Sequence, residues 1–301
     1  MRILFVIVGP TGVGKTEICM RVAKTMGIPV INADSRQMYA EIPIGTAAPV
    51  EEQLREVKHY FVGNLHLTDY YSASKYEEDV LSLLRTDPLF VQSPVALMSG
   101  GSMMYVDAVC QGIDDIPTID AEVRSYMKQR LENEGLERLV EELRLLDPAY
   151  FAIVDRKNTR RVVHALEICH QTGRTYTSFR TRQCAPRWFK TVKIGLNRDR
   201  QELYDRINRR VLDMIDRGFV EEALRVYPFH EENSLNTVGY KELFEYLDGL
   251  CTLENAITRI QNNTRKYCRK QLTWYQRDPN VRWFHPDDFD GIMDYINQNI
   301  D

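Results

Sequence analysis

A glycine-rich segment near the N-terminus has the residue types and spacing of a phosphate site. Residues 9–16 read Gly-Pro-Thr-Gly-Val-Gly-Lys-Thr, a G-x-x-x-x-G-K-T motif that is also typical of ATP-binding proteins, and the apolar run Ile3–Val8 precedes it. Backbone N–H groups of such a turn point at phosphate oxygens, and the following helix adds its positive end. We expect Lys15 at the outer phosphate and the Thr16 hydroxyl on Mg²⁺. The motif leaves the phosphate compound and its fate open.

Asp34 is the second candidate for chemistry. It follows the short apolar segment 29–33, a predicted strand, and is followed by Ser35, Arg36 and Gln37. A carboxylate at a strand end can act as a general base or hold Mg²⁺ through water. The alternative is a turn or helix-capping aspartate. The polar neighbours favour a functional site.

The segment 94–98 is another predicted strand, and it ends in Ser99-Gly100-Gly101 with no acidic residue. An ordinary ATPase needs an aspartate at this point to hold Mg²⁺, so this class is disfavoured. Two glycines suit a close approach of backbone to ligand, or simply a tight turn.

Three arginines, Arg206, Arg209 and Arg210, lie on a predicted helix. Arg206 and Arg210 are four residues apart and therefore share a face. A cation aimed at the phosphate loop would stabilise charge on a leaving group. The alternative is a surface pair with Asp205 or Asp213.

The elements that must position these residues alternate between strand and helix in the first third of the chain. This order predicts a parallel α/β sheet with helices on both faces and ligands at the carboxyl ends of its strands. We predict a P-loop NTPase-like core at 1–112 plus 188–301 and a helical insertion domain at 113–187, whose helices follow a break at 114–117. The predicted strands are 3–8, 29–33, 94–98, 190–196 and 281–284, and the predicted helices are 15–26, 72–86, 121–134, 136–146, 160–172, 200–217, 219–226, 239–247 and 253–276.

The composition is that of a globular protein, with 44% hydrophobic and 27% charged residues among 301. No apolar run approaches the ~20 residues that cross a membrane, and the first six-residue run reads as a strand, not a signal peptide. Six scattered cysteines without a CxxC pair argue against a structural zinc site or a disulfide framework. We expect a cytoplasmic protein without a membrane partner.

Charge is unevenly distributed. The net charge is −4, but residues 259–282 carry seven basic residues and one acid, which leaves −10 on the rest of the chain. Tyr267, Trp274 and Tyr275 lie within this segment and offer stacking surfaces for bases. The segment indicates RNA binding, with a solvated helix face as the alternative.

Several motifs, taken together and in order, resemble the bacterial tRNA dimethylallyltransferase family. The resemblance covers nearly the whole chain. Its motifs are Gly9–Thr16, Asp34-Ser35, Ile44-Gly45-Thr46-Ala47, Gly100-Gly101-Ser102-Met103-Met104-Tyr105, Val238-Gly239-Tyr240-Lys241 and Arg269-Lys270-Gln271-Leu272-Thr273-Trp274.

The resemblance implies transfer of a dimethylallyl group from dimethylallyl diphosphate to N6 of adenosine 37 in the anticodon stem-loop of tRNA. Asp34 is then the base, Arg210 the cation at the diphosphate, and Thr16 the Mg²⁺ ligand. The implied diphosphate-binding residues are Gly9, Pro10, Thr11, Gly12, Val13, Gly14, Lys15 and Thr16. The implied tRNA-binding residues are Asp34, Ser35, Arg36, Gln37, Ser102, Arg124, Arg160, Arg161, His164, Gly239, Tyr240, Lys241, Lys270, Gln271, Thr273 and Trp274.

Two other functions remain open from the residues alone. One is a P-loop small-molecule kinase in which Asp34 accepts a proton from a substrate hydroxyl. The other is an RNA-binding module whose loop senses a nucleotide. We expect a monomer. The insertion either clamps the anticodon stem or packs on the core.

Overall fold

The computed structural model describes residues 2–114, 116–180 and 186–300. The chain divides into two compact units, Met1–Gln111 with Pro186–Asp301, and Gly112–Ala185. Residue 115, within the break predicted at 114–117, lies outside the described residues. Cys184, one of the six cysteines, also lies outside them.

The first unit is built on one six-stranded sheet. Its strand order is β3-β2-β4-β1-β5-β6, and every neighbouring pair is parallel. The predicted α/β class with a parallel sheet is confirmed, while the two-residue strand β3 was not predicted. The strands are β1 (Arg2–Val8), β2 (Val30–Asn32), β3 (His59–Tyr60), β4 (Val95–Ser99), β5 (Phe189–Leu196) and β6 (Val281–Phe284).

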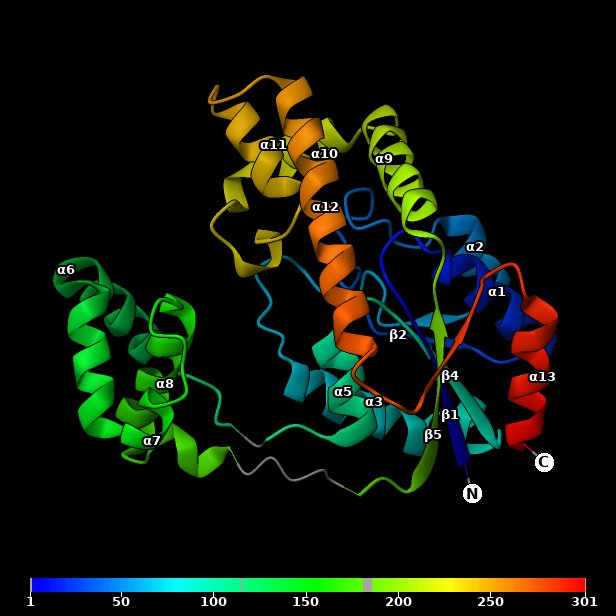
Figure 1. Cartoon of the computed structure of the whole chain (residues 1–301), viewed down its shortest axis with the longest axis horizontal. Coiled ribbons are helices and arrows are strands. Elements are labelled where there is room, and N and C mark those ends of the chain that lie inside the picture. The colour runs from blue at the N-terminus through cyan, green and yellow to red at the C-terminus, as the bar shows by residue number, and fades with distance from the viewer. Residues whose placement is uncertain (1, 115, 181–185, 301) are drawn as a thin grey trace. The chain divides into compact units, whose positions relative to one another are not determined.

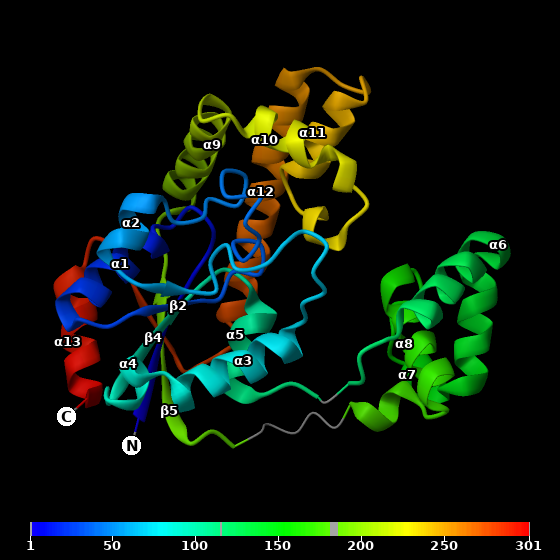
Figure 2. The ribbon, with the colours of Figure 1, turned by 180° about the vertical axis from the view of Figure 1, so that it is seen from behind.

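Helices cover both faces of this sheet because alternate strand residues point to opposite sides. Phe5 and Ile7 pack with α1 (Lys15–Met26) and α13 (Phe289–Ile300). Leu4 and Val6 pack on the other face with α3 (Ala73–Thr86) and α5 (Met103–Gln111). Figures 1 and 2 show the sheet between these two pairs of helices. Neither α5 nor α13 was predicted.

The carboxyl ends of the central strands meet at one edge. Ile7 of β1 pairs with Ser99 of β4, and Asn32 of β2 pairs with the same serine. The phosphate loop, Asp34 and the Gly100-Gly101 turn therefore all start from this edge. Helices α9 (Arg200–Asp216) and α12 (Leu253–Tyr275) lie beside it (Figure 1).

Helix α12 connects the sheet to a separate helical cluster. Its first half packs through Ile260 with α9, α10 (Phe219–Val226) and α11 (Tyr240–Leu247). Its second half packs on the sheet through Cys268 and Tyr275. A long helix anchored in two apolar clusters is a rigid support for residues at the sheet edge.

In the described part of the second unit, the secondary structure is helical. Its core joins Met127, Leu143 and Val162. Gly135, at φ 77°, interrupts α6, so the two helices predicted at 121–134 and 136–146 are confirmed. The elements of this unit are α6 (Ala121–Leu146), α7 (Pro148–Phe151), α8 (Thr159–Thr172) and the 3-10 turn Tyr176–Phe179.

The short elements of the first unit are α2 (Glu51–Glu56), α4 (Pro88–Val91) and the 3-10 turns Tyr227–Phe229 and Asn233–Leu235. Among the described residues, no helix combines the length and the apolarity that crossing a membrane requires.

Candidate active site

A cavity of about 540 Å³ opens at the carboxyl edge of the sheet. Its wall combines the phosphate loop with the strand-end residues Asp34 and Gly101, the α9 arginines and Tyr267 of α12. The motifs that the sequence singled out separately therefore line one cavity.

The phosphate loop has the backbone that its glycines predict. Gly14 caps α1 with φ 106°, a conformation that other residues rarely adopt. The Lys15 ammonium donates to the carbonyl oxygens of Gly9 at 3.0 Å and Pro10 at 2.9 Å. Burial lowers the pKa of Lys15 to about 8, although Asp34 opposes the shift. With this pKa the buried ammonium is mostly protonated at neutral pH and can therefore bind an anion.

The α9 arginines are directed at this loop. Arg210 Nη2 donates to Thr11 Oγ1 at 2.6 Å, and Arg206 Nε donates to the Gly12 carbonyl at 2.9 Å. Among the described residues, the buried Arg210 Nε has no hydrogen-bond partner. Burial lowers the pKa of Arg210, against the effect of Asp34. In this structure Arg206 and Arg210 therefore contact the loop and do not form the alternative surface pairs with Asp205 or Asp213 among the described residues. Arg210 retains one unused N–H donor.

Asp34 forms a local turn and also lies in the wall of the cavity. Its Oδ1 accepts the N–H of Arg36 at 3.0 Å, a local turn, while the residue also lines the cavity. A Cβ at Gly101 would lie 3.1 Å from Oδ2, and one at Gly100 only 2.1 Å from the backbone of Ala33. The glycine pair therefore allows β2 and β4 to end side by side, with Asp34 against Gly101.

Gln271 joins the two loops across the cavity. Its Oε1 accepts the Thr11 N–H at 2.8 Å, and its Nε2 donates to the Gly101 carbonyl at 2.9 Å. Tyr267 donates to the same carbonyl at 3.2 Å. Gln271 therefore connects the phosphate loop to the Gly100-Gly101 turn, a role that the sequence did not indicate, since it suggested only RNA binding.

A second wall is held by Glu222, whose importance the sequence did not indicate. The fully buried Glu222 of α10 accepts the N–H groups of Ile44 and Gly45 at 2.8 Å each, and the Tyr240 hydroxyl at 2.6 Å. Gln37 donates to the carbonyl of Ala47, which lines the cavity with φ 51°. These bonds connect the Ile44–Ala47 motif with the Gly239-Tyr240 motif, which sequence spacing alone cannot do.

The residues expected to bind RNA fall into three groups. The first is buried and used within the protein: Gly239, Tyr240 and Gln271. The second lies on the first unit with at least partial exposure: Asp34, Ser35, Arg36, Gln37, Ser102, Lys241, Lys270, Thr273 and Trp274. The third belongs to the second unit: Arg124, Arg160, Arg161 and His164. For Gly239 and Tyr240 the structure indicates a structural role in place of the expected RNA contact. The buried Tyr240 side chain donates to Glu222 and is not accessible to solvent.

Three hydrogen bonds hold members of the exposed group. The Ser102 hydroxyl accepts the Ser35 N–H at 2.8 Å and donates to the Ser35 hydroxyl at 2.9 Å. Trp274 donates from its indole to Asp107 at 2.8 Å while remaining 36% exposed. Its ring is thus fixed and still accessible for stacking.

Two basic residues of α12, Arg265 and Arg269, lie four residues apart and both approach Tyr204 of α9. Arg269 Nη1 lies 3.3 Å from the Tyr204 hydroxyl, and the Arg265 guanidinium is 5.7 Å from the centre of that ring. Within the part of the chain that the structure describes, Arg265, Lys266, Arg269 and Lys270 form no ion pair with a carboxylate. Their charge is therefore available to an external anion.

A magnesium site made of protein ligands alone is not formed by the described residues, which contain no cluster of three or more metal-binding side chains. Thr16, at the first turn of α1, lines the cavity together with Asp34. Mg²⁺ that is bound mainly by substrate phosphates and water needs only one or two such protein groups. The residues present fit that mode.

Comparison with known proteins gives consistent matches. A family model described as IPP transferase matches residues 37–278. A relative from Bacteroides fragilis (strain YCH46), named tRNA dimethylallyltransferase 1, is 58% identical over 299 residues, 99% of each chain.

Solved structures agree. A full-length tRNA isopentenylpyrophosphate transferase from Bacillus halodurans is 32% identical with a TM-score of 0.72, over 100% of this chain and 97% of that one. A eukaryotic dimethylallyltransferase acting on tRNA has a TM-score of 0.76 at 21% identity, over 95% of this chain and 74% of that one. At that identity the likeness supports the fold alone.

Proposed function

Because the chain belongs to the IPP transferase family, we propose that it transfers the dimethylallyl group of dimethylallyl diphosphate to N6 of adenosine 37 in a tRNA anticodon loop. One observation carries this proposal: the phosphate loop, a cation with an unused donor at Arg210, and the carboxylate of Asp34 line the same cavity. The reaction needs groups that bind the leaving diphosphate and a group that accepts a proton.

In the proposed reaction, N6 of adenine attacks C1 of the prenyl group. The N6–C1 bond forms, the C1–O bond to diphosphate breaks, and one N6 proton passes to the Asp34 carboxylate. A positioned base helps because the amino group becomes acidic only as the new bond forms. The freed negative charge develops on the diphosphate oxygen beside Lys15 and Arg210, which stabilise it.

Thr16 would hold Mg²⁺ at the diphosphate. When bound, the ion neutralises charge on phosphate oxygens. The protein itself supplies the cradle of N–H groups, the two cations and the base.

The RNA side of the proposal rests on exposed residues around the cavity. Ser35 and Ser102 are already oriented by their mutual hydrogen bonds, and the Trp274 ring is accessible for stacking. Unpaired anticodon-loop bases can leave the stack at little cost, which favours extrusion of adenosine 37. For the second unit we propose a contact with the anticodon stem, made by Arg124, Arg160, Arg161 and His164. A tRNA substrate implies action in the cytoplasm, and we propose a monomeric enzyme.

The test uses dimethylallyl diphosphate labelled on the prenyl group, Mg²⁺ and two unmodified anticodon stem-loops. One stem-loop carries adenosine at position 37 and the other guanosine. We expect label on the first only, at N6. Asp34→Asn retains an oxygen to accept the Arg36 N–H, so its fold should persist while transfer falls about 10²–10⁴-fold. Absence of label on the adenosine stem-loop with the wild-type enzyme would overturn the proposal.

A further inference from the structure

We propose that Arg198 is a positioning residue that orients the Val13–Gly14 peptide of the phosphate loop toward the diphosphate, and that Asp287 and Glu202 act through it. This inference rests on the proposed function only in taking diphosphate as the anion. Arg198 lies in the short link between β5 and α9, outside every motif singled out from the sequence.

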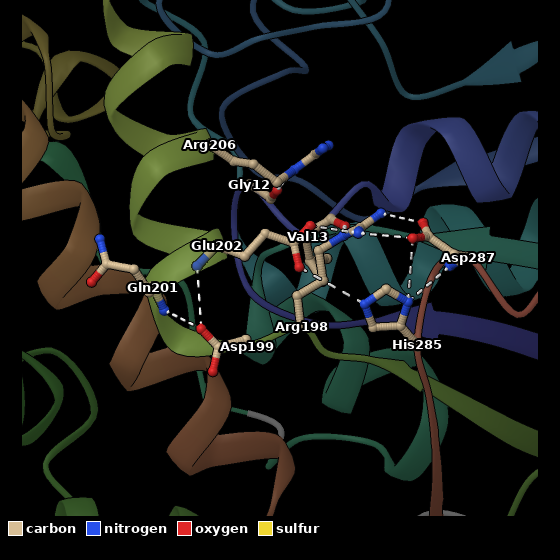
Figure 3. A network of polar contacts seen from close by, with 9 residues as sticks. All are labelled: Gly12, Val13, Arg198, Asp199, Gln201, Glu202, Arg206, His285 and Asp287. Carbon is tan, nitrogen blue, oxygen red and sulfur yellow. Dashed lines mark hydrogen bonds and ion pairs between the residues drawn. The ribbon is translucent and has the colours of Figure 1, made fainter.

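The contacts of Arg198 converge on the outer side of the loop (Figure 3). Its Nε donates to the Val13 carbonyl at 3.0 Å. Nη1 donates to Glu202 Oε1 at 2.6 Å, and Nη2 donates to Asp287 Oδ1 at 2.8 Å. The guanidinium side chain is only 8% exposed. Its planar donors therefore join the phosphate loop, the first turn of α9 and the loop before α13.

The direction of the Val13 carbonyl determines the direction of the next N–H. In a planar trans peptide the C=O of Val13 and the N–H of Gly14 point to opposite sides. With the carbonyl held on the outer side by Arg198, the Gly14 N–H points to the side of the cavity, which Gly14 lines. In the described chain this N–H has no backbone partner. It is available to a phosphate oxygen.

This peptide needs an external restraint. Gly14 adopts φ 106°, and glycine crosses between backbone regions more easily than any other residue. The Val13–Gly14 peptide can therefore rotate at low cost and turn its carbonyl toward the diphosphate, where it would repel the anion. Arg206 of α9 restrains the neighbouring Gly12 carbonyl, whereas the side-chain donor to the Val13 carbonyl is Arg198.

The carboxylates fix the guanidinium in turn. Asp287 comes from the loop between β6 and α13, and Glu202 from the first turn of α9. His285 faces both of them, with Nε2 3.9 Å from Glu202 and Nδ1 3.6 Å from Asp287. The hydrogen bond from Arg198 lowers the pKa of Asp287, which keeps the pair ionised. The loop before α13 thus acts on the diphosphate site through Arg198.

The test measures binding of inorganic pyrophosphate with Mg²⁺ by calorimetry, together with kcat and KM for prenyl transfer. Arg198→Met keeps the aliphatic stem but removes every donor. We expect its Kd for pyrophosphate and its KM for dimethylallyl diphosphate to rise about tenfold, the effect of losing one correctly oriented charged contact. The Kd for tRNA should not change. Arg198→Lys should recover only part of the loss, because one ammonium cannot serve the carbonyl and both carboxylates.

Two further variants separate positioning from general stability. Glu202 and Asp287 are 41% and 71% exposed, so they stay solvated in Arg198→Met and the variant should fold. If Asp287 acts through Arg198, the single variant Asp287→Asn should weaken pyrophosphate binding. In the Arg198→Met background, the same substitution should cause no further loss of affinity. Arg21→Met removes a cation that stacks on Phe289 of α13 without contacting the loop. It should leave the Kd unchanged.

The proposal fails if the folded Arg198→Met variant has a Kd for pyrophosphate within twofold of the wild-type value. It also fails if Asp287→Asn raises this Kd by the same factor in the Arg198→Met background as in the wild-type protein. Failure of the wild-type enzyme to bind pyrophosphate at all is a different result, and it would contradict the proposed diphosphate site itself.

Discussion

Arg210 of α9 donates a 2.6 Å hydrogen bond to the hydroxyl of Thr11, so a cation is fixed at the phosphate loop before any ligand arrives. A preorganised charge needs no rearrangement when negative charge develops on a leaving group. This contact joins the phosphate loop to a helix that begins almost 200 residues later, so α9 forms part of the candidate site.

Replacing Arg210 with Met should lower kcat about 10²–10³-fold with little change in tRNA affinity, because the lost interaction is strongest as the bond to diphosphate breaks. Arg209→Met is the matched control, since Arg209 lines the same cavity while the hydrogen bond to Thr11 comes from Arg210. Rapid-quench single turnover measures the step. Equal losses in both variants would mean that α9 supplies only general positive charge.

Pyrophosphate affinity should depend on the ionisation of Lys15. Burial lowers the pKa of this ammonium to about 8 in the free chain. Affinity should therefore be full below pH 8 and decline up to about tenfold per pH unit above it, because only the charged form attracts phosphate. The unfolded chain keeps the proton until a higher pH, so the same shift makes the free energy of unfolding increase as pH rises above 8.

The control for this pH dependence is Lys15→Met, in which ionisation of pyrophosphate itself is unchanged. Calorimetric titrations of both proteins from pH 6.5 to about 9.5 isolate the lysine by difference. Identical pH profiles would show that Lys15 keeps its charge throughout and that its burial is offset by neighbours such as Asp34.

Changing Lys266, Arg269 and Lys270 together to Ala should weaken tRNA binding and reduce the slope of log K against log salt by about 2, the value for three phosphate contacts. Filter binding over a salt series measures both. Arg259→Ala serves as the control because Arg259 already pairs with Glu245. An unchanged slope in the triple variant would assign these cations to a solvated face.

Glu222→Ala should destabilise the protein by about 2–5 kcal/mol, since it leaves two N–H groups and one hydroxyl unsatisfied in the interior. Urea unfolding followed by circular dichroism gives the free energy. The neighbouring exposed Glu221→Ala should stay within about 0.5 kcal/mol of wild type. A loss under about 1 kcal/mol in Glu222→Ala would mean that water replaces the carboxylate.

The sequence was sufficient for the parts of the site that depend on local pattern. The loop Gly9–Thr16 follows its strand and leads into its helix as predicted, and Asp34 lies just after β2 in the wall of the cavity. The family suggested by the motifs is confirmed by the family model and by relatives of full length. These comparisons support the transferase and not the kinase alternative.

What the sequence could not provide depends on contacts between distant segments. Glu222 lies 178 residues from Ile44, Gln271 lies 260 residues from Thr11, and Arg198 lies 185 residues from Val13. No spacing rule connects such pairs, because only folding brings them together. Exposure is equally non-local: Gly239 and Tyr240 lie in a recognisable motif, yet packing against Phe219 buries them.

The most direct test of the central claim is the fate of the diphosphate in a single turnover. The enzyme, Mg²⁺ and an unmodified adenosine-37 stem-loop are mixed with dimethylallyl diphosphate labelled in both the prenyl group and the phosphates. If the loop holds a leaving group, one intact pyrophosphate is released for each prenyl group attached to RNA. Release of orthophosphate, or phosphate label on the RNA, would contradict the account.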